Sequence, residues 1–129
     1  MALSLLSLAA ATFALCADGP RINCVVDGDT FWLNGEKVRL ADINAPETHQ
    51  AACPAERELG QRATWRLIAL LNAGAFTLEI EGRETDRYGR ALRVARRSGR
   101  SLGQQLVSEG LAEPWRGRRS DWCTLLAAR

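Results

Sequence analysis

RINCVVDGDTFWLNGEKVRLADI, residues 21–43, is the stretch that decides the fold. Its pattern predicts strands over residues 21–27, 30–33 and 38–43. Asn34-Gly35, between the second and third of these strands, is the strongest two-residue hairpin signal. The stretch therefore predicts a three-stranded meander.

A helix is expected after the meander. Pro54 suits the first position of a helix, and Gly74 lies where that helix would end. The apolar positions that recur at helical spacing between them are Ala63, Leu67, Ile68 and Leu71. This apolar stripe predicts a helix that packs on the sheet.

The second half of the chain predicts two more strands that form a hairpin-like pair. Residues 76–80 and residues 91–95 alternate as strands, and Tyr88-Gly89 marks a turn between them. The second strand ends before Ser98-Gly99.

A short helix follows the last strand. Ser101 and Gln104 form a capping box at its start, and Gly110 is placed to end it. Strands in groups of three and two around a helix fit an α+β, mainly β, fold: a five-stranded OB-fold barrel with two or three helices. The pattern alone also permits other small α+β arrangements.

Length and charge indicate one domain with an uneven surface. The chain has 129 residues, of which 47% are hydrophobic, enough for a single core over residues 21–123. Residues up to 82 hold six basic and ten acidic side chains, whereas residues from 83 onward hold eleven and five. The basic half is a candidate surface for a polyanion. Solvated arginines would explain the same count.

The N-terminal segment, residues 1–17, resembles a secretory signal. It is rich in Leu and Ala, carries no charged side chain, and is short for a membrane span. Small residues favour cleavage after Ala11, with Ala17 as the competing site. We therefore expect export to the periplasm or the medium. An uncleaved membrane tether and a misplaced start codon are the alternatives, because no Lys or Arg precedes the apolar stretch.

Four cysteines form an even set, which in a small exported protein predicts two disulfides. No CxxC pair is present, and a single histidine, His49, argues against a zinc site. Cleavage after Ala11 keeps all four cysteines. Of the three possible pairings we expect Cys16–Cys24, which the Asp-Gly-Pro turn at residues 18–20 brings together, and Cys53–Cys123, which ties down the tail.

Three separated motifs carry residues suited to phosphodiester chemistry. They are VDGDT at residues 26–30, DINAPET at residues 42–48 and DRYGR at residues 86–90. Carboxylate and amide oxygens in them are ligands for hard cations, and arginine forks match phosphate oxygens. The three motifs, in this order, resemble the staphylococcal (micrococcal) nuclease family, the thermonucleases, over residues 21–115.

The resemblance implies roles for six residues. Arg39 and Arg90 match the arginines that bind the scissile phosphate, and Glu47 matches the carboxylate that activates water. The implied ligands of Ca²⁺ are Asp29, Asn44 and the carbonyl oxygen of Ala45. Asn44 replaces an aspartate of the family, so calcium should bind more weakly.

Four further residues are weighed beside these. Asp27 would add negative charge behind the calcium ligands, although a plain turn residue is the alternative. Arg87 and Tyr88 resemble a segment that contacts a neighbouring phosphate, and Trp115 is a candidate for stacking on a base. Tyr88 could instead be an aromatic residue at the edge of the core.

The resulting hypothesis is a calcium-dependent endonuclease, a monomer with no stable protein partner, that hydrolyses DNA and also RNA with little sequence specificity. A catalytically inactive OB-fold module that binds nucleic acid or protein is the alternative. A structural domain tethered by its N-terminus is a third interpretation.

Overall fold

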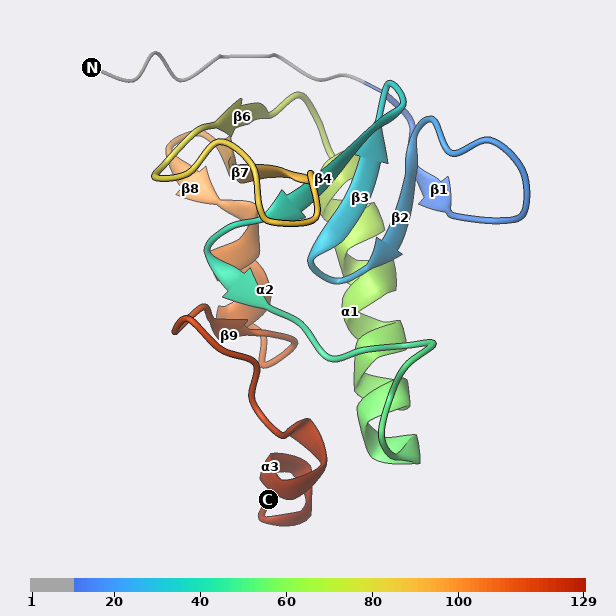
Figure 1. The fold of residues 1–129 in the computed structure, drawn as a ribbon, viewed down its shortest axis with the longest axis vertical. Coiled ribbons are helices and arrows are strands. Elements are labelled where there is room, and N and C mark those ends of the chain that lie inside the picture. Colours follow the sequence, from blue (N-terminus) through green and yellow to red (C-terminus); the bar gives the residue numbers. More distant parts are fainter. Residues whose placement is uncertain (1–10) are drawn as a thin grey trace.

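The predicted meander forms. The computed structural model describes residues 11–129, and Figure 1 shows their arrangement. Asn34 and Gly35, with φ of +50° and +82°, take the left-handed backbone of a two-residue hairpin. Three antiparallel strands result: β2 (Cys24–Asp27), β3 (Thr30–Leu33) and β4 (Glu36–Leu40).

The bounds expected for the first and third strands were wrong. The first strand begins at Cys24, not at residue 21. The third ends at Leu40, the chain turns, and residues 43–44 form a separate strand, β5 (Ile43–Asn44). A side chain explains the break, because the Arg39 guanidinium donates hydrogen bonds to the carbonyl oxygens of Leu40 and Ile43. β5 pairs with β9 (Glu113–Pro114).

The second group of strands completes the OB-fold sheet. β6 (Thr77–Glu79) is shorter than expected and β7 (Ala91–Arg97) longer, and the two pair antiparallel, as predicted. β7 also runs parallel to β4, which joins the two groups in the order β2-β3-β4-β7-β6. Within residues 11–129 no ladder closes β6 onto β2, so the barrel is open. The α+β, OB-type fold is confirmed.

Two short strands extend this sheet beyond the expected five. β1 (Ala14–Leu15) pairs parallel with β2, and β8 (Arg100–Ser101) pairs with β7 across a tight turn.

Three helices accompany the sheet: α1 (Pro54–Asn72), α2 (Leu102–Ser108) and α3 (Trp122–Ala127). Ser101 caps α2 by accepting a hydrogen bond from the backbone N–H of Gln104, as predicted. The Gln104 side chain does not complete the capping box. It donates instead to the backbone carbonyl oxygen of Asp42, which ties α2 to the turn before β5.

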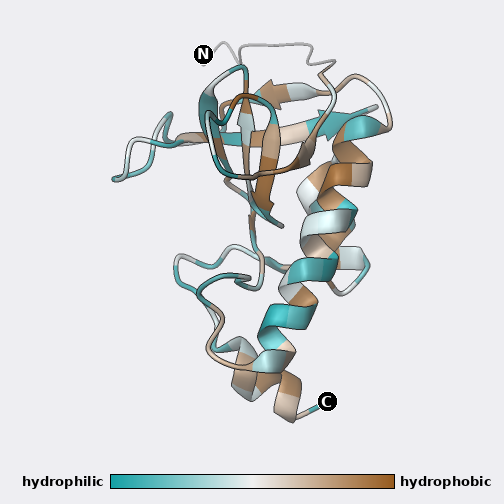
Figure 2. Ribbon diagram, turned by 90° about the vertical axis from the view of Figure 1, so that its right-hand side faces the viewer, coloured by the Kyte–Doolittle hydropathy of each residue, from teal (hydrophilic) through white to brown (hydrophobic). Residues whose placement is uncertain are grey.

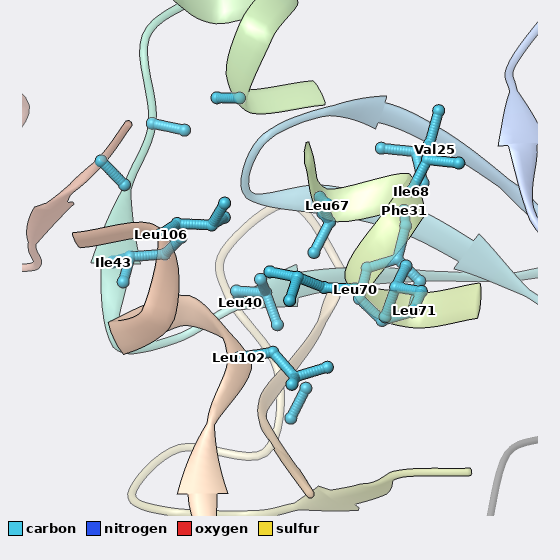
Figure 3. Close-up of a cluster of buried hydrophobic side chains, with 14 of the residues drawn as sticks. Val25, Phe31, Leu40, Ile43, Leu67, Ile68, Leu70, Leu71, Leu102 and Leu106 are labelled. Carbon is cyan, nitrogen blue, oxygen red and sulfur yellow. The ribbon is translucent and has the colours of Figure 1, made fainter. Parts of the chain in front are cut away.

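The core lies between the sheet and the C-terminal half of α1. Figure 2 shows this half, alongside the sheet, as the more hydrophobic part of the helix, while the N-terminal half extends beyond the sheet and is more hydrophilic. Figure 3 shows the buried cluster, in which Leu67 and Leu71 of α1 meet Phe31 and Leu40 of the sheet. All four side chains are fully buried. The helical stripe read from the sequence therefore faces the core.

The chain before the expected domain start also packs on this core. Phe13 is 3% exposed, and its backbone N–H and carbonyl both hydrogen-bond the side-chain amide of Asn72 at the end of α1. A cut after Ala11 would keep this anchor, whereas a cut after Ala17 would remove it. The signal segment over residues 1–10 lies outside the described residues and stays a prediction. No helix within residues 11–129 has the length and apolarity to cross a membrane.

Both expected disulfides are present. Cys16 is bonded to Cys24, with 4.8 Å between their Cα atoms, and Cys53 to Cys123, with 6.1 Å. The second bond links the residue before α1 to α3, and Figure 1 shows α3 beside the N-terminal end of α1. The predicted pairing is confirmed.

Candidate functional site

Arg39 of β4 faces inward and is held by several partners. It is 5% exposed, and Nη2 lies 3.5 Å from a carboxylate oxygen of Asp29. Nη1 donates to the carbonyl oxygen of Ile43 at 2.9 Å. The ring of Trp115 covers the guanidinium, 5.5 Å from ring centre to Cζ. The outward, solvated alternative for this arginine does not occur.

Asp29 is a buried carboxylate held by three partners besides Arg39. One oxygen accepts hydrogen bonds from the backbone N–H of Ala45 at 2.8 Å, and the other from the Thr30 hydroxyl at 2.9 Å. Burial alone would raise the pKa of Asp29, but the positive charge of Arg39 and the hydrogen bonds, including one with Asp27, keep it below the usual value. Asp29 is therefore ionised at neutral pH.

Asp27 lies beside Asp29 in a different state. Its carboxylate accepts a hydrogen bond from the backbone N–H of Asp29 at 3.2 Å. Burial and then the neighbouring charge of Asp29 raise the pKa of Asp27 to about 8. The two aspartates together therefore carry about one negative charge near neutral pH, less than two independent carboxylates would.

Asn44 is 1% exposed and only half satisfied. Its amide nitrogen donates to the Glu113 carboxylate at 2.8 Å across the β5–β9 pair, but its amide oxygen has no hydrogen-bond partner. A buried oxygen without a donor costs free energy unless a ligand reaches it. This oxygen and the carboxylate of Asp29 are the hard donors that calcium prefers, so the residues fit the cation.

The acidic donor set is small, however. Among residues 11–129 no group of three or more His, Cys, Asp or Glu side chains is arranged to hold a metal ion. A cation at Asp29 would rely on amide, carbonyl and water oxygens for its other ligands. Ala45, whose carbonyl was expected to contribute, is buried, and its N–H is bonded to Asp29.

Glu47 sits on the loop between β5 and α1. Its carboxylate forms an ion pair with Arg119, and its backbone N–H donates to the buried carboxylate of Glu56 at 3.1 Å. Gly60 of α1 lets this loop approach, because a Cβ there would lie 2.5 Å from the carbonyl oxygen of Glu47. The loop is therefore held from the helix side.

Arg90 is held by its own loop. Asp86 accepts from Arg90 Nε at 2.6 Å and, through its second oxygen, from the backbone N–H groups of Tyr88 and Arg90 at 2.9 Å. Desolvation raises the pKa of Asp86, but these hydrogen bonds outweigh it and lower the pKa overall. The Tyr88 ring, 69% exposed, stacks on both Arg87 and Arg90. It is not an aromatic residue of the core edge.

Two adjoining cavities bring most of the predicted residues together. We call the first the arginine cleft: it has a volume of about 530 Å³ and is lined by Arg39, Arg83, Arg87, Arg90, Arg119, Tyr88, Trp115 and others. We call the second the acidic cavity: it has a volume of about 260 Å³, and Asp27, Asp29 and Glu47 line it. Arg90 and Arg119 line both. Asn44 and Ala45 line neither cavity; both are buried, and the backbone N–H of Ala45 is bonded to Asp29.

This arrangement places cations and carboxylates on adjacent sides of one site. Arginine forks in the cleft can bind phosphate oxygens, and the carboxylates next to them can accept a proton or bind a cation. Trp115, 42% exposed at the cleft wall, offers part of its ring to a base. His49 is exposed at the rim of the acidic cavity, as expected.

Four residues of the site were not predicted from the sequence: Glu56, Gly60, Glu113 and Arg119. Glycine inside the helical pattern was a visible signal for a close approach at residue 60. Glu56 binds the backbone N–H of Glu47, nine residues before it. The other two act across long sequence separations: Glu113 meets Asn44 69 residues away, and Arg119 meets Glu47 72 residues away. No local pattern marks such pairs.

Comparisons with known proteins identify a family and several relatives. The family model described as "Staphylococcal nuclease homologue" matches residues 37–123. Two relatives from Bacillus subtilis, "Endonuclease YncB" and "SPbeta prophage-derived endonuclease YokF", are each 37% identical over 93 residues. The matches cover 67% of this chain, and 43% and 31% of the two relatives respectively.

A third relative has a different kind of name. "Succinoglycan biosynthesis protein ExoI" of Rhizobium meliloti is 36% identical over 93 residues, which cover 68% of this chain and 48% of the relative. The chain thus spans less than half the length of each of these relatives. Because the family model matches most of the length of this chain, the chain belongs to the family of staphylococcal nuclease homologues.

Proposed function

We propose that this protein is a nuclease that hydrolyses phosphodiester bonds of DNA and RNA. The observation that carries the proposal is the junction of the arginine cleft with the acidic cavity, which sets phosphate-binding cations beside a carboxylate able to accept a proton. Two relatives named as endonucleases support it.

In this proposal Arg39 and Arg90 hold the non-bridging oxygens of the scissile phosphate. Arg39 reaches the cleft with its guanidinium fixed by Asp29 and Trp115, so little reorganisation is needed when charge builds up on the phosphate. Glu47 accepts a proton from the attacking water. The family resemblance implies cleavage of the 5′ P–O bond, which leaves a 3′-phosphate.

We propose Ca²⁺ as the cofactor, held by Asp29, the Asn44 amide oxygen and the Ala45 carbonyl. When bound, the ion would neutralise charge on a phosphate oxygen and satisfy the unpartnered oxygen of Asn44. Because Asn44 is uncharged and Asp27 is largely protonated, we expect modest affinity.

We expect low sequence specificity because of the residues that line the cleft. Its cations suit the phosphate backbone, which carries no sequence information. Trp115 and Tyr88 offer aromatic faces, and stacking on these is tolerant of base identity. We expect cleavage of single strands of any sequence.

A digestion assay tests the proposal. The wild-type protein should cleave single-stranded DNA in calcium and lose activity in excess chelator. Glu47→Gln changes little volume, so it should remain folded and bind DNA while cleaving far more slowly. Cleavage that continues unchanged in chelator would overturn the calcium assignment. Binding by wild type without any cleavage, in calcium or in other divalent ions, would favour a binding module, which the missing charge at Asn44 also favours.

We also propose that the chain is exported, with cleavage after Ala11. Two disulfides need an oxidising compartment, and Phe13 and Cys16 have structural roles that this cut preserves. Mass spectrometry of the exported protein should find Thr12 as its first residue. A mass that includes residues 1–11 would instead indicate a retained N-terminal segment.

A further inference from the structure

The segment between β9 and α3 brings a third arginine to the site. Arg119 forms an ion pair with Glu47 and lines both the arginine cleft and the acidic cavity. We propose that Arg119 holds the Glu47 carboxylate in place and binds the same phosphodiester as Arg39 and Arg90. This inference rests on the proposed function, and it assigns that function a residue outside the three sequence motifs.

The guanidinium of Arg119 can make both contacts at once. One nitrogen, Nη1, is used by Glu47, and among residues 11–129 the other nitrogens have no partner. The side chain is 51% exposed, so these donors are open to a ligand in the cleft. An arginine fork of this kind can bridge a carboxylate and a phosphate without breaking either contact.

A disulfide brings Arg119 to Glu47. Cys53 follows Glu47 by six residues and Cys123 follows Arg119 by four, so the disulfide and the ion pair join the same two segments. Glu56 lies behind both, bonded to the backbone N–H of Glu47 and 3.8 Å from the sulfur of Cys123. The Cys53–Cys123 bond therefore restricts the positions open to Arg119 before substrate binds.

The competing interpretation is an ordinary surface ion pair. Such a pair contributes little to stability, and its loss would change neither folding nor catalysis. Our proposal agrees about stability but not about catalysis. Arg119→Ala should therefore leave the melting temperature nearly unchanged while slowing cleavage, a combination that a merely structural role would not give.

The first experiment compares Arg119→Ala, Arg119→Lys and Arg118→Ala. Arg118 is an exposed neighbour that lines neither cavity, so its variant is a matched control for lost charge. Single-turnover cleavage of a short oligothymidylate should slow by on the order of 10- to 100-fold in Arg119→Ala, the loss expected for one charged hydrogen bond. Arg119→Lys should recover part of the rate, and Arg118→Ala should match wild type.

A double-mutant cycle tests whether Arg119 acts on Glu47. If it does, Arg119→Ala should lower the cleavage rate by a much smaller factor in the Glu47→Gln background than in wild type. Equal costs in both backgrounds would overturn the coupling and leave Arg119 a phosphate ligand alone. Unchanged cleavage and unchanged oligothymidylate binding in Arg119→Ala would overturn the whole inference.

The role of the disulfide is tested by Cys53→Ser/Cys123→Ser, with Cys16→Ser/Cys24→Ser as the matched control, at a temperature where circular dichroism shows both folded. The first variant should slow cleavage by a factor similar to that of Arg119→Ala. Combining it with Arg119→Ala should slow cleavage little further. Equal cleavage rates in both cysteine variants would contradict the restraint.

If wild type neither binds nor cleaves oligothymidylate, the proposed function fails. If wild type cleaves and Arg119→Ala matches it, only this inference fails.

Discussion

Arg39 and Arg90 line one cleft, yet the protein holds them in different ways. Arg39 is buried and bound to Asp29 of another segment and to the turn before β5. Arg90 is more exposed, and its closest partner is Asp86, four residues earlier in the same loop. One arginine is fixed by tertiary structure and the other by a local turn.

The site therefore has two halves, one around Arg39 and one around Arg90, and they should differ in how much they contribute to stability. Removing the Arg39 charge would leave the Asp29 carboxylate buried without its main compensating cation. An uncompensated buried charge destabilises the folded state as a whole. Removing the Arg90 charge would disturb only the surface loop that contains Asp86. The two halves should therefore respond alike in catalysis and unlike in unfolding.

The largest expected effect is on the free energy of unfolding. Arg39→Met should destabilise the protein by about 3–5 kcal/mol, the cost of removing one partner of a buried ion pair. Arg90→Met, the matched variant, should cost less than about 1 kcal/mol. Urea denaturation measures both. Adding Asp29→Asn to Arg39→Met should recover part of the loss, and equal destabilisation by the two single variants would contradict the comparison.

The second prediction concerns turnover, where the two arginines should behave alike. Lysine keeps the charge but not the two-pronged geometry, so Arg39→Lys and Arg90→Lys should each slow single-turnover cleavage by about 10²–10³-fold, the usual cost of one lost transition-state donor. Equilibrium DNA binding should change much less. A variant that binds DNA more weakly but cleaves bound DNA at the wild-type rate would show that its arginine stabilises the ground state and the transition state equally.

The smallest expected effect comes from adding a charge near Arg39 and Asp29, the buried half of the site. Asn44→Asp replaces the neutral oxygen of a proposed ligand with a carboxylate, so calcium should bind more tightly, by roughly tenfold, since hard cations favour charged oxygen ligands. Asp86→Asn, in the surface loop that holds Arg90, is the control and should leave calcium binding unchanged. Titration calorimetry checks both. Equal or weaker binding by Asn44→Asp would count against a cation site at Asp29.

Local signals explain how much of the fold was readable in advance. The Asn34-Gly35 turn, the apolar stripe of α1 and the Ser101 cap each act over a few residues, and each formed as predicted. The break after β4 was not readable, because the Arg39 side chain that binds Leu40 and Ile43 could equally have faced solvent. Which way an arginine on a strand points depends on partners elsewhere in the chain.

The same division holds for the site. The sequence alone determined that carboxylates and arginines suited to phosphate chemistry are present, because three motifs carry them at short spacing. Tertiary structure alone decided that Arg119 meets Glu47, that Glu113 meets Asn44, and that Asp27 and Asp29 differ in protonation. These properties depend on burial and on contacts between distant segments, and both arise only when the sheet, α1 and the disulfide-bound tail come together.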